Sequence, residues 1–495
     1  MVSAVPAVVI AAPASGSGKT TLATGLIGAL RRAGHRVAPF KVGPDYIDPG
    51  YHGLAAGRPG RNLDPVLVGA GRVPGLYRHG ARGCDLAVVE GVMGLFDGRI
   101  DAGAGPIAEG STAQVAGLLG APVVLVVDAR GHSQSLAALL HGFATYDSGV
   151  RLGGVILNRV GSERHEQVLR AACERVGLPV LGALPRLAEL ELPSRHLGLI
   201  PVVEHGAPAH AAVAAMTELV AAHVDLAAVA ALAGATVRGE AWDPGAALRD
   251  IAPRVSGASG AGQAGSSGDP AGGARRRSAH PEVPSGERPV VAVAGGPAFT
   301  FGYAEHRELL AAAGARVEVF DPLLDPLPPA TAGLVVPGGF PEEHAERLAA
   351  NTPLLGEVAA LAAAGLPVHA ECAGLLYLAR SLDGHRMAGV IDADAEFGPR
   401  LTLGYRDAVA LADSPLWRAG QRVRGHEFHR TRLLRTGAPV RAWGWRGSDG
   451  RPVTEGAVTG AVHASYLHTH PAGDPTAIAR FTTAAAAFAA TRIGA

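Results

Sequence analysis

The sequence has few cysteines and no excess of charge of either sign. Its 495 residues include three cysteines, and 44 basic residues balance 44 acidic ones. An odd number of widely spaced cysteines fits neither a disulfide framework nor a cysteine-based zinc site. A net charge of zero gives no electrostatic reason to expect nucleic acid or an anionic membrane as a partner. We therefore expect a globular protein of the cytoplasm.

Long apolar runs are also missing. No window is long and apolar enough to predict a membrane span, and the apolar start of the chain has no basic segment before it. The length exceeds one ordinary core and predicts more than one domain. Residues 246–288 are rich in Gly, Ser, Ala and Pro and have no apolar periodicity. We predict two domains, residues 1–245 and 289–495, joined by this stretch as a flexible linker.

The stretch near the N-terminus predicts a phosphate-binding loop. A β-branched run at residues 8–10 predicts a strand, and residues 22–32 have the apolar spacing of a helix. Between them, small residues allow backbone N–H groups to face phosphate oxygens, and the start of the helix favours an anion. The predicted ATP-binding residues are Gly16, Ser17, Gly18, Lys19, Thr20 and Thr21.

Within this loop, we expect Lys19 to reach the β- and γ-phosphates and Thr20 to bind Mg²⁺. Pro13 stands where such loops usually have their first glycine. The alternative interpretation is an ordinary glycine-rich turn between a strand and a helix.

A proline-bounded loop follows the second predicted strand, at residues 36–42. Parallel sheets bind ligands at the carboxyl ends of their strands. We therefore predict that Asp48 binds Mg²⁺ and that Lys41, Asp45 and Tyr46 contact the substrate. The alternative is a solvated Asp-Pro turn.

Three more apolar strands are predicted at residues 86–89, 123–128 and 154–158, and each is followed by or ends in a polar residue. Such strands, alternating with Ala-rich helices, predict a doubly wound parallel α/β sheet.

Polar residues at these strand ends are further candidates for the site. Glu90 fits a Mg²⁺ ligand, and Asp97 is predicted to lie beside the nucleotide and place the substrate. Asn158 either reads the nucleotide base or ties down its own loop.

Five ordered motifs together resemble the cobyrinic/hydrogenobyrinic acid a,c-diamide synthases. They are residues 12–21, 41–49, 90–98, 156–161 and 194–199. The resemblance covers nearly the whole chain apart from the linker. It implies an ATP-dependent amidoligase with a first domain like dethiobiotin synthetase and a class I glutamine amidotransferase domain after it. It also makes Pro13 the usual residue at its position.

A second α/β pattern begins at Val290 and places Cys372 at a sharp turn between a strand and a helix. The helix N-terminus is expected to lower the pKa of this thiol, and free N–H groups there would stabilise an oxyanion. Gly338 and Gly339 form a turn that we predict as a second oxyanion donor. The alternative is a small buried cysteine that packs the sheet.

A nucleophilic cysteine needs a base, and residues 460–470 contain three histidines. Their spacing does not choose among them. The resemblance assigns His468, and it implies no third, acidic member of the site. The roles of His426, His429, His463 and His470 stay open.

The resemblance also implies the reaction. Glutamine would lose its amide nitrogen at Cys372, and the ammonia would replace phosphate on a substrate carboxylate activated by ATP and Mg²⁺. The substrate would be the a and c acetates of a corrin ring in cobalamin biosynthesis. The alternatives are another tetrapyrrole acid, or a P-loop ATPase with a non-catalytic C-terminal binding module. The metallation of the ring and the order of amidation stay open, and a homodimer is possible.

Overall fold

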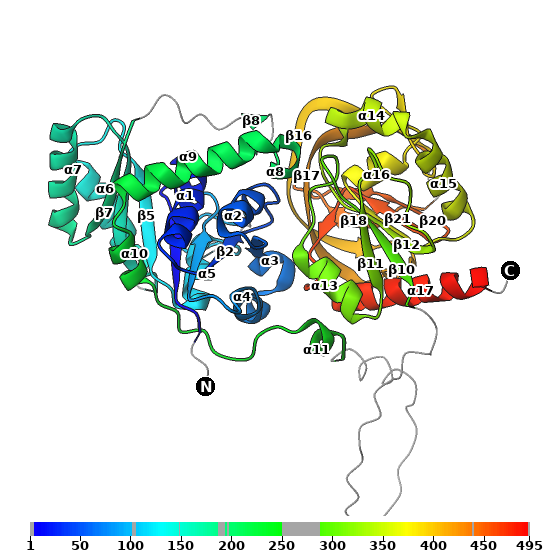
Figure 1. Cartoon of the computed structure of the whole chain (residues 1–495), viewed down its shortest axis with the longest axis horizontal. Helices are drawn as coiled ribbons and strands as arrows, with labels where there is room; N and C mark the ends of the chain where they lie inside the picture. Colours follow the sequence, from blue (N-terminus) through cyan, green and yellow to red (C-terminus); the bar gives the residue numbers. More distant parts are fainter. Residues whose placement is uncertain are drawn as a thin grey trace, which may run out of the picture.

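The computed structural model describes residues 4–100, 105–147, 149–186, 194–195, 198–249, 288–437 and 440–493. Two α/β domains lie side by side, and the C-terminal helix α17 (Pro475–Ile493) runs along the second domain (Figure 1). Residues 250–287 of the predicted linker lie outside the described residues, as do residues 196–197 of the fifth sequence motif. Every described helix is too short or too polar to cross a membrane.

The first domain contains seven parallel strands in the order β3-β2-β4-β1-β5-β6-β7, as a doubly wound sheet requires. The strands are β1 Ala7–Ala11, β2 Val37–Val42, β3 Arg61–Leu63, β4 Leu86–Glu90, β5 Val123–Asp128, β6 Leu152–Val160 and β7 Val180–Pro185. Ser194–Arg195 (β8) and Gly198–Leu199 (β9) form a separate two-stranded sheet. The predicted fold class is confirmed, although the sequence did not single out β3 and β7.

Helices cover both faces of this sheet. They are α1 Lys19–Arg32, α2 Asp48–Ala56, α3 Pro65–Val68, α4 Val73–Gly80, α5 Thr112–Leu119, α6 Leu136–Thr145, α7 Glu163–Val176, α8 Val202–His205, α9 Ala207–His223 and α10 Leu226–Leu232; a 3₁₀ turn spans Ala70–Arg72. Alternate residues of β1 enter opposite cores, because successive side chains of a strand point to opposite faces. Val9 packs in the core with α4 to α7, whereas Val8 and Ile10 pack with α1, α2 and α9.

The second domain combines two sheets. The first has the order β11-β10-β12-β13-β21-β20, and the second has β15-β14-β16-β17-β22 with β18 and β19 beside it. The strands are β10 Val290–Ala294, β11 Arg316–Phe320, β12 Thr331–Val336, β13 Val368–Glu371, β14 Ser381–Leu382, β15 His385–Arg386, β16 Ala393–Ala410, β17 Arg422–Thr436, β18 Trp443–Arg446, β19 Pro452–Glu455, β20 Ala457–Thr459, β21 Val462–Ser465 and β22 His468–Thr469. The helices are α13 Ala304–Ala312, α14 Ala345–Ala350, α15 Thr352–Ala363, α16 Ala373–Leu378 and α17, with a 3₁₀ turn at Pro341–His344.

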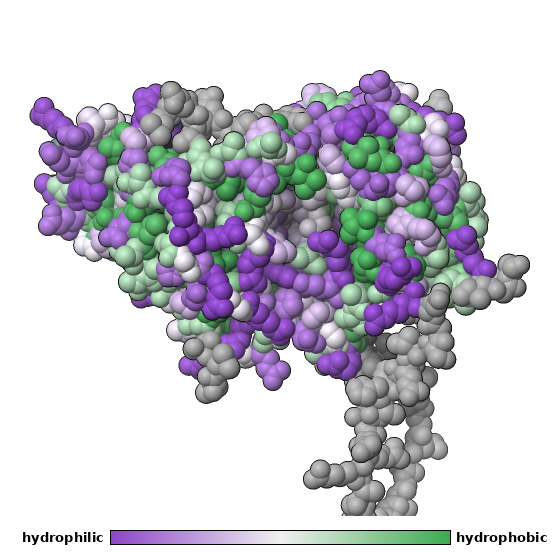
Figure 2. All heavy atoms as spheres, in the orientation of Figure 1, coloured by the Kyte–Doolittle hydropathy of each residue, from purple (hydrophilic) through white to green (hydrophobic). Residues whose placement is uncertain are grey.

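Polar contacts join the two domains. Arg61 lies 2.6 Å from Glu305 and also pairs with Glu308, whose other oxygen is 2.9 Å from His79. Figure 2 shows hydrophilic residues gathered along the lower part of this junction. Helix α11 (Pro244–Arg249), which follows the first domain, packs against α13 and α17 of the second. Residues that follow β2 and β3 contact the second domain as well: Tyr46 stacks on Phe301, and Tyr405 donates a hydrogen bond of 3.0 Å to Asp64 Oδ2, so the carboxyl ends of these strands face that domain.

Candidate active sites

The phosphate-binding loop ends at α1, which begins at Lys19. Gly16 and Gly18 have φ angles of 78° and 91°, a region that glycine adopts without steric cost. The side chain of Asn158 donates a hydrogen bond of 2.9 Å to Ser17 O, and a Cβ atom on Gly18 would lie 2.3 Å from the same amide. Asn158 therefore ties down the loop after β1 and not its own loop, which differs from the second role considered for it, and its role toward a nucleotide base stays a prediction.

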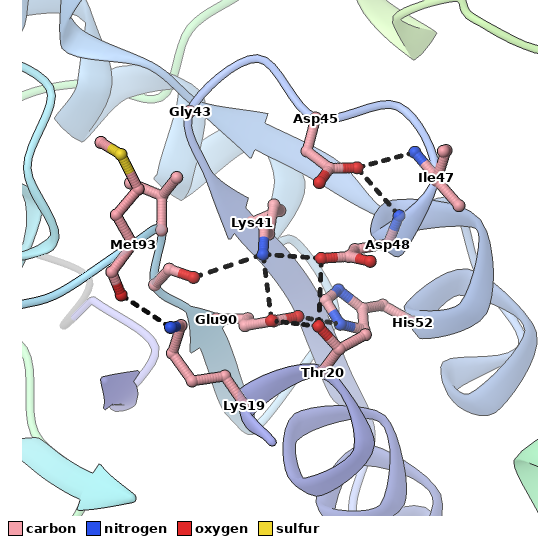
Figure 3. Close-up of polar contacts among 12 residues, drawn as sticks. Lys19, Thr20, Lys41, Gly43, Asp45, Ile47, Asp48, His52, Glu90 and Met93 are labelled. Carbon is pink, nitrogen blue, oxygen red and sulfur yellow. Dashed lines mark hydrogen bonds and ion pairs between the residues drawn. The ribbon is translucent and has the colours of Figure 1, made fainter. Parts of the chain in front are cut away.

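Lys19 is buried and reaches across this loop (Figure 3). Its Nζ donates hydrogen bonds of 2.6 Å to Met93 O and 3.4 Å to Ala14 O. Burial lowers the pKa of Lys19 to about 8, and Asp97 is one of the carboxylates that partly offset this effect. Asp97 itself accepts a hydrogen bond of 3.1 Å from Gly94 N. The amine is thus held by two backbone carbonyl groups, one of this loop and one of the segment after β4.

Three oxygen atoms converge beside Lys19. Thr20 Oγ1 lies 2.7 Å from Glu90 Oε1 and 3.2 Å from Asp48 Oδ2 (Figure 3). Among the described residues, no three His, Cys, Asp or Glu side chains form a metal-binding group. Magnesium, however, is usually held by one or two carboxylates together with phosphate oxygens and water. A hydroxyl and two carboxylates next to a phosphate loop fit that requirement.

A buried cation, Lys41, lies between the two carboxylates. Its Nζ is 2.7 Å from Asp48 Oδ2 and 3.0 Å from Glu90 Oε1. Burial alone would lower the pKa of Lys41, but the two carboxylates raise it, so the amine stays charged. For Glu90 the effects are reversed: burial alone would raise its pKa, but Lys41 and His52 hold that pKa below its usual range. For Asp48, burial and the nearby Asp45 raise the pKa.

His52 is a site residue that the sequence did not single out. Its Nε2 lies 2.7 Å from Glu90 Oε2, and its side chain is fully buried. His52 stands four residues after Asp48, on the same face of α2. That spacing was the signal available in the sequence.

Asp45 shapes the start of α2. Its Oδ1 accepts hydrogen bonds of 2.8 Å from Ile47 N and 3.0 Å from Asp48 N. The helix therefore begins at Asp48, and the loop is shorter than the sequence predicted, because a helix rather than a rigid loop contains Pro49. The free N–H groups at the start of a helix explain why a carboxylate is favoured there.

Tyr46 points away from the phosphate loop and across the domain junction. Its ring centroid lies 5.1 Å from that of Phe301, 4.9 Å from that of Tyr303 and 5.0 Å from that of His468. The loop that carries Asp45 and Asp48 thus also touches the second domain, and Tyr46, predicted as a substrate contact, lies among aromatic rings.

Cys372 lies between β13 and α16, and 2% of its surface is exposed. Its φ of 49° is rare for a residue with a side chain and marks a sharp turn of the kind that presents a nucleophile. Its N–H donates a hydrogen bond of 2.7 Å to Ser465 O. The expected lowering of the thiol pKa is wrong: burial, with Glu342 adding to it, raises that pKa, and α16 has only six residues.

His468 is fully buried beside the Gly338–Gly339 turn. A Cβ atom on Gly338 would lie 2.3 Å from His468 Cε1, and one on Gly339 would lie 2.1 Å from Ala298 O, so both positions require glycine. Burial lowers the pKa of His468 to about 4, which leaves the imidazole neutral near pH 7. A neutral imidazole is able to accept a proton.

Comparison with known proteins matches the domain of each site to a known family. Residues 8–200 match the CobQ/CobB/MinD/ParA nucleotide binding domain, and residues 290–476 match the CobB/CobQ-like glutamine amidotransferase domain. Over 482 residues, the chain is 58% identical to the hydrogenobyrinate a,c-diamide synthases of Mycobacterium tuberculosis and Streptomyces coelicolor; the match covers 97% of this chain and 98% and 97% of those proteins. The chain belongs to the hydrogenobyrinate/cobyrinate a,c-diamide synthase family. The cobyrinate a,c-diamide synthase of Gloeobacter violaceus is 42% identical over 473 residues, which cover 94% of this chain and 93% of that protein.

Membership of this synthase family confirms the resemblance seen in the five motifs. The first domain is a nucleotide-binding domain and the second is of the class I glutamine amidotransferase type, as predicted. The chain is therefore a ligase with an amidotransferase domain.

The histidines with open roles are packed around the second site. His426 pairs with His468 in the register of β17 and β22, and His429 stacks on Tyr466 at 3.8 Å. His470 packs against Tyr303 at 4.2 Å. Burial lowers the pKa of several of these imidazoles, namely His306, His426 and His463 to about 3 and His470 to about 4. Burial therefore keeps these four imidazoles neutral near pH 7.

Proposed function

We propose that this chain amidates the a and c acetate carboxylates of hydrogenobyrinic acid, with ATP and glutamine as cosubstrates. The relatives at 58% identity are named for hydrogenobyrinate, and the relative at 42% is named for cobyrinate. One observation carries the proposal: a carboxylate and lysine cluster follows a phosphate loop in one domain, and in the other domain Glu371, the residue before Cys372, lies 3.8 Å from the buried His468. Two such sites are needed because a carboxylate must be activated before ammonia can replace its oxygen.

At the first site, residues 16–21 would hold the ATP phosphates. Thr20, Asp48 and Glu90 would hold Mg²⁺, which neutralises charge on the transferred phosphoryl group. Lys19 would move from its carbonyl partners to the β- and γ-phosphates. Lys41, Asp45, Tyr46 and Asp97 remain our proposed contacts for the ring carboxylate.

At the second site, His468 would take the proton of the Cys372 thiol as the sulfur attacks the carboxamide carbon of glutamine. Backbone N–H groups of the Gly338–Gly339 turn would bind the oxyanion. His468 would then give the proton to the leaving nitrogen, and ammonia would depart. Water would hydrolyse the thioester to glutamate. At the first site, the γ-phosphoryl group of ATP would pass to the ring carboxylate with release of ADP, and ammonia would displace phosphate from the resulting acyl phosphate.

The test is a comparison of nitrogen donors. Cys372→Ser should abolish amidation with glutamine and leave amidation with an ammonium salt within about twofold of wild type, because a serine hydroxyl is far less acidic than a thiol. Ring amidation is measured by mass, with hydrogenobyrinic and cobyrinic acids in parallel at matched ATP. Equal loss with both donors would show that Cys372 acts through the fold.

His468→Ala should give the same donor split as Cys372→Ser. His429→Ala is the matched control, because His429 is another buried imidazole of the same site whose Nδ1 lies 2.8 Å from Thr431 O. A larger loss of glutamine-dependent amidation in His429→Ala than in His468→Ala would reassign the base.

A further inference from the structure

The residue before Cys372 is a buried carboxylate, Glu371, at the end of β13. Its Oε1 accepts hydrogen bonds of 3.0 Å from Thr469 N and 2.8 Å from Thr469 Oγ1. The same oxygen lies 3.2 Å from His369 Nε2. Thr469 is the neighbour of His468 in β22, so Glu371 joins the strand that ends at Cys372 to the strand that carries His468.

The second oxygen of Glu371 faces His468. Oε2 lies 3.8 Å from His468 Nδ1, and neither ring nitrogen of His468 has a hydrogen-bond partner in the described part of the chain. A hydrogen bond of this kind is about 2.7–3.2 Å long. A movement of about 1 Å would therefore bring the imidazole and the carboxylate into contact. A buried ring nitrogen without a partner is costly, which favours that movement.

The other carboxylate near His468, Glu427, is already engaged by an arginine. Three titratable neighbours of His468, namely His426, Glu427 and His429, come from β17. Glu427 lies 2.6 Å from Arg406 Nε and 3.6 Å from His429 Nε2. Glu371 is thus the carboxylate that meets Nδ1. Although burial acts to raise its pKa, His369, His468 and Thr469 hold the pKa of Glu371 at about 2, so it carries a negative charge.

We propose that Glu371 is a positioning residue that accepts a hydrogen bond from Nδ1–H of His468. This bond would fix the tautomer whose Nε2 is free to take the proton of Cys372, and it would stabilise the imidazolium that exists until the proton passes to the leaving ammonia. Glu371 stays a carboxylate throughout. The inference rests on the proposed roles of Cys372 and His468, and it supplies the acid that the sequence did not assign.

The test is Glu371→Gln, which keeps the shape of the side chain and an oxygen for Thr469 but removes the charge. We expect glutaminase kcat to fall about 100-fold, with KM for glutamine changed less than about threefold and ammonium-dependent amidation unchanged. The acidic limb of the glutaminase pH profile should shift to lower pH, because a negative neighbour raises the pKa of His468. A merely structural role would not move this limb.

Glu427→Gln is the control, because it removes another nearby negative charge without touching Nδ1. It should cost less than about threefold in kcat. Equal losses in Glu371→Gln and Glu427→Gln would overturn the inference and leave a general effect of charge. Loss of ammonium-dependent amidation in Glu371→Gln would also overturn it.

Cys372→Ser, assayed in parallel, distinguishes failure of the Glu371 inference from failure of the proposed function. If Cys372→Ser loses glutaminase while Glu371→Gln keeps it, only the role of Glu371 fails. If Cys372→Ser itself keeps glutaminase, the proposed nucleophile fails. Thr469→Val, which removes one donor to Glu371, should give a loss smaller than that of Glu371→Gln; a loss as large would again contradict the inference.

Discussion

The lysine of the first site and the cysteine and histidine of the second respond to burial in different ways. At the phosphate loop, Lys41 stays charged because it lies within 3.0 Å of two carboxylates. At the cysteine turn, burial holds the Cys372 thiol and the His468 imidazole in their neutral forms. The first site therefore carries its charges before ligands arrive, as suits a highly charged nucleotide. In the proposed mechanism, the second site would form its thiolate only when His468 takes the proton of Cys372.

The largest effect is expected for Lys19→Ala. Loss of the amine should reduce amidation by at least about 100-fold with either nitrogen donor, because the acyl phosphate would not form without charge stabilisation. Amidation is measured with glutamine and with ammonium, and glutaminase is measured separately. Retained amidation with ammonium would break the assignment of the phosphate loop.

Gly338→Ala probes the neutral site from its backbone. The new Cβ atom would lie 2.3 Å from His468 Cε1 and would displace the ring. We expect about 100-fold lower glutaminase with ammonium-dependent amidation preserved, because displacements of about 1 Å have such effects. Gly356→Ala is the control, since no atom lies within 4 Å of its Cβ position. Normal glutaminase in Gly338→Ala would show that the turn adapts.

Lys41→Met tests whether the charges of the first site balance one another. Removal of the cation leaves Asp48 and Glu90 buried without the amine that lies between them, and we expect a loss of about 3 kcal/mol in the free energy of unfolding at pH 7.5. Lys19→Met is the matched control, because the Lys19 amine donates only to backbone carbonyls; it should cost about 1 kcal/mol. Urea unfolding with and without MgCl₂ measures both. Equal losses would contradict the comparison.

The smallest effect concerns acid and the second domain. The folded-state pKa values of His306, His426, His463, His468 and His470 lie at about 3 to 4, below the value of about 6.5 expected in the unfolded chain. The unfolded chain therefore binds more protons between these values, and stability falls as the pH drops below about 6.5.

Uptake of protons by these histidines in the unfolded chain is therefore expected to lower the free energy of unfolding in that window. Tryptophan fluorescence is a suitable probe, because Trp417, Trp443 and Trp445 lie in the second domain. Urea midpoints at pH 7.5 and pH 5.5 give the measurement. An unchanged midpoint would show that the imidazoles titrate normally in the folded domain.

Local patterns predicted much of this molecule. Apolar runs located β2, β4, β5, β10 and β12, because strands buried on both faces are nearly continuous in apolar residues. The phosphate-loop motif pointed to Thr20, and polar residues after β2 and at the end of β4 pointed to Asp48 and Glu90; the structure brings these three together.

Contacts between segments far apart in the chain could not be predicted from the sequence. His52 and Glu371 were missed because their partners, Glu90 and His468, lie far away in the chain. The predicted lowering of the Cys372 pKa was wrong because burial, which depends on the packed domain, outweighs the effect of a short helix on that pKa. The long half-exposed strands β16 and β17 have no such apolar runs, and the sequence did not predict them.

Tyr46 bears on whether the two domains can be exchanged independently of each other. This ring belongs to the loop that positions Asp48, yet it stacks on Phe301 and approaches the His468 ring at 5.0 Å. Neither domain is then a self-contained cassette, because each contributes to the surroundings of the other's reactive groups. A chimera that exchanges the amidotransferase domain would also have to keep the aromatic rings that pack around residue 46, whatever the length of the connecting segment.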